Sequence, residues 1–269
     1  MVYKEWGKEN NPNVLICVHG LTRASDDFDA LADALCGQYR IICPDVVGRG
    51  RSSWLKNPAY YTLPVYVSDL LHLIAQARTE TLAWLGTSMG GLIGMMIAAM
   101  DAGYVQKLIL NDIGPALNPA AMSRIGDYVG QQHEFATFEE AEQYVRNISS
   151  SFGPHDEEQW HKLARNVLKT NAQGKWIRNH DPGIALPFHS QMEGGRQQAE
   201  KLLWAAYESL SCPTLLVRGR ESDLLTASTA REMTRRGPKA KLIELDEVGH
   251  APMFMHAEQI ELVTRFLNS

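Results

Sequence analysis

Short, strongly apolar segments alternate with helix-length amphipathic segments along most of the 269-residue chain. The apolar segments are rich in valine, isoleucine and leucine, which is typical of strands buried on both faces of a sheet. Strands are predicted at residues 14–18, 40–43, 81–85, 107–110, 214–217 and 241–245, with one edge strand at residues 2–6. The alternation therefore predicts an α/β fold with a mostly parallel central sheet of about seven strands, flanked by helices.

The segments between these strands carry the apolar spacing of amphipathic helices. Residues 63–77 have Pro64 in the first turn and repeat apolar residues along one face. Residues 92–100 are apolar nearly all round, so this helix is expected to be the most buried. Two further helices are predicted at residues 28–36 and 257–267.

One long segment interrupts the alternation. Between residues 117 and 210 there is no convincing strand, and the sequence is rich in Gln, Glu, His and Trp. We therefore predict an α/β core formed by residues 1–116 and 211–269. Residues 117–210 are predicted to be an inserted helical cap, lying over the carboxyl ends of the strands.

The composition excludes several classes of protein and partner. An apolar fraction of 45% is ordinary for a globular protein. The net charge is −5 and no basic stripe is visible, so neither nucleic acid nor a membrane is expected as a partner. The polar start of the chain and four unpaired cysteines predict a cytoplasmic protein. No His or Cys cluster has zinc-ligand spacing, so no metal is expected.

Residues 86–90 read Gly-Thr-Ser-Met-Gly, between the strand at 81–85 and the helix at 92–100. A G-x-S-x-G sequence in that context is the pattern of a nucleophile elbow. The sharp turn forces unusual backbone angles on the serine, and the glycines on either side relieve the crowding. We therefore predict that Ser88 is an exposed nucleophile, rather than part of a plain glycine-rich turn.

A serine hydroxyl needs a base, and His250 is the best candidate among the nine histidines. It lies in the loop that follows the last predicted strand. Asp223, which follows the strand at 214–217, is the predicted carboxylate partner of the imidazole. The chain order Ser88, Asp223, His250 is that expected for a triad on such a sheet. Glu221 in the same loop and Asp112 at the end of another strand stay open as alternatives.

The other histidines have weaker claims to act as the base. His133, His155 and His161 lie in the polar insert and are predicted to be solvated. His180 and His189 are predicted either to line a pocket or to lie at the surface.

Acyl transfer also needs two backbone N–H groups that stabilise an oxyanion. Met89 directly follows the nucleophile and is the first predicted donor. The second donor is expected from the loop after the strand at 14–18, where we predict Leu21. Gly20 allows that loop to turn back towards the site, and His19 is expected to brace it.

Together these features resemble the α/β-hydrolase superfamily, in particular its small bacterial members with a helical cap. The resemblance is carried by His19-Gly20, the Asp-Val-Val-Gly-Arg-Gly-Arg-Ser segment at 45–52, the elbow at Ser88, the Asp223 loop and Gly249-His250. It implies a Ser-His-Asp hydrolase that forms an acyl-enzyme without a metal or an organic cofactor. The chain departs from the family pattern in two places. The leading β-hairpin is shortened to one strand, and three residues rather than two separate the loop glycine from Asp223.

The predicted activity is cleavage of a carboxylic ester, or a related acyl compound, through an acyl-enzyme on Ser88. The expected partner is a small-molecule acyl substrate held in a mostly apolar pocket beneath the cap. Two alternatives stay open. One is a lactone or carbon–carbon bond hydrolase with the same triad, and the other is a catalytically weak ligand-binding protein with this fold. No oligomeric state is predicted.

Overall fold

A seven-stranded sheet forms the centre of the computed structural model, which describes residues 1–79, 81–188 and 195–269. The strand order is β1-β3-β2-β4-β5-β8-β9, and only β1 runs antiparallel to its neighbour. The strands are β1 (Val2–Trp6), β2 (Asn13–Val18), β3 (Arg40–Asp45), β4 (Thr81–Thr87), β5 (Lys107–Asn111), β8 (Thr214–Gly219) and β9 (Lys241–Leu245). The predicted α/β fold, with about seven mostly parallel strands, is confirmed.

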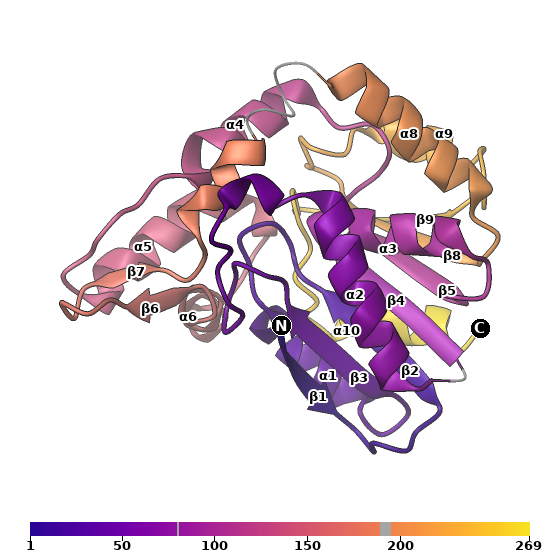
Figure 1. Cartoon of the computed structure of the whole chain (residues 1–269), viewed down its shortest axis with the longest axis horizontal. Coiled ribbons are helices and arrows are strands. Elements are labelled where there is room, and N and C mark those ends of the chain that lie inside the picture. Colours follow the sequence, from indigo (N-terminus) through magenta and orange to yellow (C-terminus); the bar gives the residue numbers. More distant parts are fainter. Residues whose placement is uncertain (80, 189–194) are drawn as a thin grey trace.

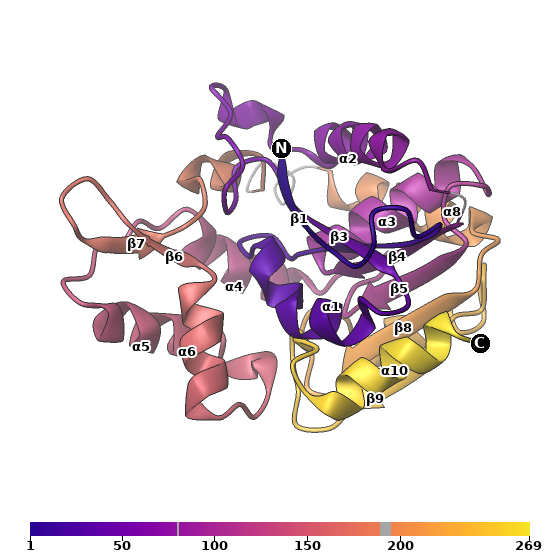
Figure 2. The ribbon, with the colours of Figure 1, turned by 90° about the horizontal axis from the view of Figure 1, so that it is seen from below.

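Helices cover both faces of this sheet (Figure 1, Figure 2). One face carries α1 (Asp29–Leu35) and α10 (Ala257–Leu267), and the other carries α2 (Leu63–Ala77), α3 (Met89–Met100) and α8 (Arg196–Ser209). Each face has its own apolar cluster, and successive residues of β2 alternate between the two clusters. None of the described helices is long and apolar enough to cross a bilayer.

Several short helical elements also occur in the described chain. They are α9 (Ala227–Met233) and four 3-10 turns, η1 (Ser25–Phe28), η2 (Pro58–Tyr60), η3 (Ser150–Phe152) and η4 (Pro182–Ile184).

The inserted segment contains α4 (Pro119–Val129), α5 (Phe138–Ile148) and α6 (Glu157–Arg165). It also contains a two-stranded antiparallel sheet, β6 (Leu168–Thr170) and β7 (Trp176–Arg178), so the expectation that no strand lies there is wrong. Each strand has only three residues, which is too short for an alternating pattern to be visible in the sequence. The helix α8 falls within the predicted cap but packs against α3 of the core (Figure 1). The cap boundaries at 117 and 210 stay predictions.

The helix α3 sits unusually close to the sheet. Trp84 of β4 is fully buried, and its indole Nε1 donates a hydrogen bond of 3.0 Å to the carbonyl oxygen of Gly90. Gly94 faces the same indole, and a Cβ atom at that position would lie 2.2 Å from Nε1. The absence of a side chain at Gly94 is therefore what allows the helix and the tryptophan to pack together.

Gly94→Ala is expected to lower the free energy of unfolding by about 1–3 kcal/mol, because the added methyl group overpacks the core. This is the reverse of the ordinary effect, since alanine normally stabilises a helix interior by about 1 kcal/mol relative to glycine. Urea denaturation measures the change. Gly37→Ala is the matched control, because nothing lies within 4 Å of a Cβ at that position. Equal stability of the two variants would contradict this account of the packing.

A pair of histidines joins the inserted segment to the core. The rings of His155 and His256 are stacked with centroids 5.1 Å apart, and Nε2 of His256 lies 3.1 Å from Nδ1 of His155. The prediction that His155 is solvated is wrong, because its Nε2 is buried and has no partner in the described part of the chain. Burial, followed by the neighbouring His256, lowers the pKa of His155 to about 4. The ring is therefore neutral at pH 7.

The His155 pKa predicts a pH effect on stability. Between about pH 6.5 and pH 4 the unfolded chain binds a proton at His155 that the folded chain does not. The free energy of unfolding should therefore fall as the pH drops through this window. We expect a steeper fall for the wild type than for His155→Gln when urea denaturation is repeated at pH 7, 6, 5 and 4.5. Parallel curves for the two proteins would argue against the buried neutral ring.

Candidate active site

The turn between β4 and α3 has the geometry of the predicted elbow. Ser88 has φ 52° and ψ −115°, a strained combination for a residue other than glycine. The flanking glycines permit the turn, because a Cβ atom would lie 2.2 Å from the Gly90 backbone if placed at Gly86 and 2.0 Å from the Val18 carbonyl oxygen if placed at Gly90. Ser88 thus stands at the junction of strand and helix, as predicted.

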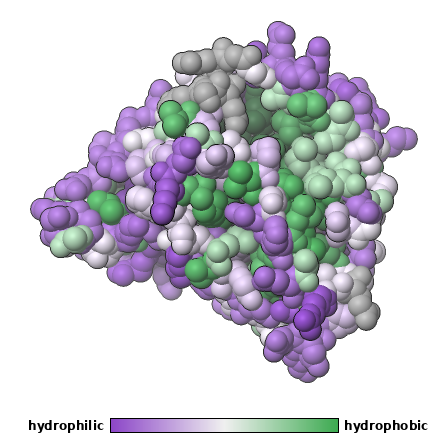
Figure 3. All heavy atoms as spheres, in the orientation of Figure 1, coloured by the Kyte–Doolittle hydropathy of each residue, from purple (hydrophilic) through white to green (hydrophobic). Residues whose placement is uncertain are grey.

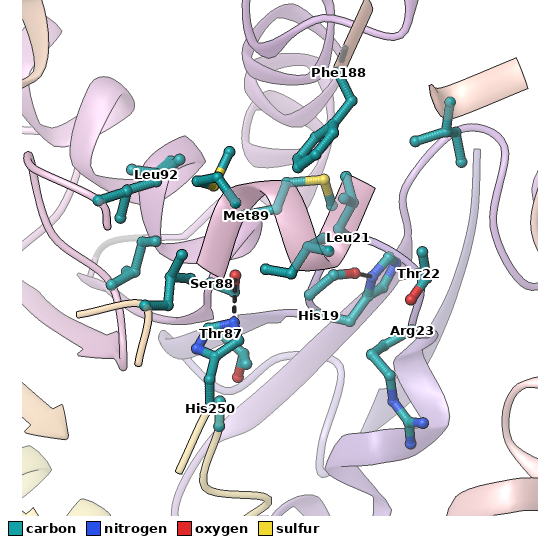
Figure 4. Close-up of a pocket in the computed structure, with 18 of the residues that line it drawn as sticks. His19, Leu21, Thr22, Arg23, Thr87, Ser88, Met89, Leu92, Phe188 and His250 are labelled. Atoms are coloured by element: carbon teal, nitrogen blue, oxygen red, sulfur yellow. Dashed lines mark hydrogen bonds between the residues drawn. The ribbon is translucent and has the colours of Figure 1, made fainter. Parts of the chain in front are cut away.

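His250 reaches this serine from the loop after β9. Its Nε2 lies 3.0 Å from the Ser88 hydroxyl oxygen. A dashed line marks this contact in Figure 4. The inserted segment holds the histidine loop in place through Ser151. The Ser151 hydroxyl donates a hydrogen bond of 2.9 Å to the carbonyl oxygen of His250, and the Ser151 carbonyl accepts one of 2.6 Å from the amide of Gly249.

The other ring nitrogen of His250 contacts Asp112, not Asp223. Nδ1 of His250 lies 2.8 Å from Oδ2 of Asp112, which is fully buried immediately after β5. Asp112, like Ser88, has a positive φ of 52°. Each ring nitrogen of His250 therefore contacts a residue whose φ is positive. Asp112 is one of the alternatives that the sequence leaves open, and it is the one that lies against the imidazole.

The prediction that Asp223 lies beside His250 is wrong. The Asp223 carboxylate pairs with Arg124 at 2.7–3.0 Å, and both side chains are nearly half exposed. Glu221 is exposed as well. The cause is a tight turn after β8, in which the amide of Ser222 donates to the carbonyl oxygen of Gly219 and Ser222 faces inward.

That loop contributes donors to Asp112 instead of a carboxylate. The Ser222 hydroxyl donates a hydrogen bond of 2.5 Å to Oδ2 of Asp112, and the amide of Gly219 donates one of 3.0 Å to Oδ1. Both oxygens of the buried carboxylate are therefore hydrogen-bonded, which fixes its orientation beside His250. The extra residue before Asp223 was the one sequence signal that this loop is unusual.

Leu21 and Met89 both lie next to Ser88 and line the same cavity (Figure 4). In the described part of the chain, neither of their amide nitrogens has a hydrogen-bond acceptor. Two free N–H groups beside the serine are what stabilisation of an oxyanion requires. The geometry is thus compatible with the predicted donors.

His19 braces the Leu21 loop. The amide of Val46 donates to Nε2 of His19 at 3.0 Å, so Nδ1 carries the proton and donates to the Gly20 carbonyl oxygen at 2.7 Å. Burial lowers the pKa of His19, which keeps the ring neutral and both bonds intact. The predicted bracing role of His19 is compatible with this geometry.

Arg49 is a second brace, which the sequence analysis missed. Its guanidinium is fully buried; Nε donates to the Leu21 carbonyl oxygen at 2.8 Å, and Nη2 lies 3.6 Å from the sulfur of Met89. One side chain therefore contacts both predicted oxyanion residues. Its position between two glycines in the 45–52 segment was the available sequence signal.

Ser88 and His250 line a cavity of about 510 Å³. Its lining is mostly apolar. Leu92 and Phe188 lie on the side of Ser88 opposite His250 (Figure 4). Figure 3 shows the molecule from the same side as Figure 1, the side on which α2 and α3 are seen. Apolar side chains gather over the centre of this face. The volume and lining suit a small, largely apolar ligand.

His180 is buried, and its Nε2 lies 3.1 Å from the carbonyl oxygen of Val129. His189 lies outside the described residues.

Within residues 1–79, 81–188 and 195–269, no group of three or more His, Cys, Asp or Glu side chains is placed to hold a metal ion.

Comparisons with known proteins agree with this architecture. Residues 15–262 match the model of the alpha/beta hydrolase family. The chain is 47% identical over 270 residues to a 3-hydroxybutyrate-oligomer hydrolase of Cupriavidus necator, covering 99% of this chain and 92% of that protein. An alpha/beta hydrolase from Novosphingobium aromaticivorans superposes with a TM-score of 0.89 at 35% identity, covering 99% of this chain and 93% of the other. A hydrolase described as putative from Rickettsia typhi also gives a TM-score of 0.89, at 33% identity and with 99% and 90% coverage. This chain therefore belongs to the alpha/beta hydrolase family.

Proposed function

We propose that this protein hydrolyses carboxylic esters through an acyl-enzyme on Ser88. The observation that carries the proposal is the continuous line of hydrogen bonds from Ser88 to His250 at 3.0 Å and from His250 to Asp112 at 2.8 Å. Nucleophile, base and orienting carboxylate in this order form the arrangement of a serine-hydrolase triad. Ser88 and His250 line a mostly apolar cavity together with Leu21 and Met89, and Asp112 is buried behind His250.

In the first half of the reaction, the Ser88 oxygen attacks the carbonyl carbon of the ester. Nε2 of His250 accepts the serine proton, and buried Asp112 stabilises the resulting imidazolium. The amides of Leu21 and Met89 donate hydrogen bonds to the oxyanion. His250 then gives the proton to the alcohol oxygen as the carbon–oxygen bond breaks, which leaves the acyl group on Ser88.

In the second half, water replaces the alcohol. His250 removes a proton from the water as its oxygen attacks the acyl carbon. The same two amides stabilise the second oxyanion. The proton returns to the Ser88 oxygen when the acyl bond breaks, so the carboxylic acid leaves and the enzyme is restored.

The proposed substrates are short oligomers of hydroxy acids joined by ester bonds. The relative that shares 47% identity over 99% of this chain bears the name 3-hydroxybutyrate-oligomer hydrolase. A largely apolar cavity of about 510 Å³ suits a short chain of that kind, because each unit presents methyl and methylene groups between its esters. A panel of oligomers, simple esters and lactones distinguishes this proposal from the lactone and carbon–carbon alternatives.

Ser88→Ala is expected to lower kcat for p-nitrophenyl butyrate by at least about 10⁴-fold, because the nucleophile is removed. Wild type should also react covalently at Ser88 with a fluorophosphonate probe, whereas the variant should not. Circular dichroism and the melting temperature serve as controls for the fold. Turnover by the variant at the wild-type rate would eliminate the mechanism.

Two aspartate variants test which carboxylate orients His250. Asp112→Asn is expected to reduce kcat by about 10⁴-fold, because an amide cannot stabilise the imidazolium. Asp223→Asn should retain kcat within about threefold, since that side chain pairs with Arg124 at the surface. Both values are measured on p-nitrophenyl butyrate. The opposite ranking of the two variants would return the role to Asp223.

A further inference from the structure

Four arginines line the cavity; Arg196 is one of them, and the other three lie around Tyr128. Arg23, Arg124 and Arg178 all line the cavity, and each of them lowers the pKa of Tyr128 through its positive charge, although burial raises that pKa overall. Arg23 is paired with Asp27 by two hydrogen bonds of 2.6 and 2.7 Å. Arg124 is paired with Asp223 at 2.7 Å. The positive charges of Arg23 and Arg124 are therefore each balanced by a carboxylate.

Arg178 has no carboxylate partner in the described part of the chain. Its side chain, on β7, is 7% exposed. Its guanidinium donates a hydrogen bond of 3.0 Å from Nη1 to the Tyr128 carbonyl oxygen and lies 5.4 Å from the centre of the Tyr128 ring. Nε is buried and has no acceptor in the described residues. Such an arrangement is costly, because a buried cation is normally paired with an anion.

A second tyrosine lies near this arginine but outside the cavity lining. Tyr144 does not line the cavity, and it opposes the lowering of the Arg178 pKa that burial causes. Arg178 itself does line the cavity. A guanidinium that reaches a cavity without a carboxylate partner in the described residues offers the planar N–H donors that a carboxylate accepts.

We propose that Arg178 binds the carboxylate of the substrate, so that this wall of the cavity is a subsite for the acid end of a hydroxy-acid oligomer. The inference rests on the proposed ester hydrolase function. In such an oligomer the free carboxylate belongs to the alcohol side of the last ester bond. The fragment held by Arg178 is therefore the leaving group, and the enzyme removes short acid-terminated units from the carboxyl end.

The test compares linear 3-hydroxybutyrate trimer as the free acid with the same trimer as its methyl ester. Wild type should prefer the free acid by about 10- to 100-fold in kcat/KM, the range given by one hydrogen bond to a charged group. Arg178→Gln should raise KM for the free acid by a similar factor with little change in kcat. The same variant should hydrolyse the methyl ester and p-nitrophenyl butyrate within about threefold of wild type. Arg178→Lys, which keeps the charge, should restore part of the preference.

Arg165→Gln is the matched control. Arg165 also lies in the inserted segment and also packs on an aromatic ring, 4.8 Å from the centre of Phe138, but it does not line the cavity. This variant should retain the preference for the free acid. A preference that Arg178→Gln leaves unchanged, or an equal loss on both trimers, would overturn the carboxylate subsite.

Binding without turnover gives an independent readout. In the Ser88→Ala background, the free-acid trimer should raise the melting temperature more than the methyl ester does, and adding Arg178→Gln should remove the difference. Equal shifts from both trimers in the single variant would overturn the subsite even if Arg178→Gln failed to fold. If wild type hydrolyses both trimers equally well, the subsite fails alone. If wild type cleaves neither trimer nor p-nitrophenyl butyrate, the proposed function fails.

Discussion

The close contact between the elbow and the sheet is the constraint on which the site depends. Gly90 lies so near to Val18 that no side chain fits between them, and the indole of Trp84 bonds to the Gly90 carbonyl oxygen. This packing sets where α3 begins. It thereby positions both the Ser88 hydroxyl and the Met89 amide, since the two residues occupy the turn itself. The strained backbone at Ser88 is maintained because its surroundings are rigid.

Two neighbouring strands, β5 and β8, together provide and hold the carboxylate beside His250. β5 and β8 are adjacent and parallel, so the residues after both strands meet at one edge of the sheet. Asp112 follows β5, and the loop after β8 supplies Ser222 and the Gly219 amide as its donors. An imidazole needs one buried anion, and either strand end can deliver it. Here the anion follows β5, and the loop after β8 holds it in place.

Two buried arginines contribute to the site in different ways. Arg49 contacts the Leu21 carbonyl oxygen and the Met89 sulfur, so it stabilises the loops on which the predicted oxyanion donors lie. Arg178 lies in the cavity wall, and among the described residues it has no carboxylate partner. The rest of the lining is mostly apolar. This distribution suits a chain-like substrate with an ester at one point and a charge at another.

The sequence by itself determined the sheet, the elbow and the Ser88–His250 pair, because strand periodicity and the glycines of the turn are local properties. The sequence did not reveal strands β6 and β7, because a segment of three residues is too short to show an alternating apolar pattern. Only the tertiary structure decided between Asp112 and Asp223. Both aspartates follow parallel strands, and which of them faces the imidazole depends on how the turn after Gly219 closes. It likewise decided that Arg178 is buried with no carboxylate partner among residues 1–79, 81–188 and 195–269, because burial and charge pairing depend on segments far apart in the chain.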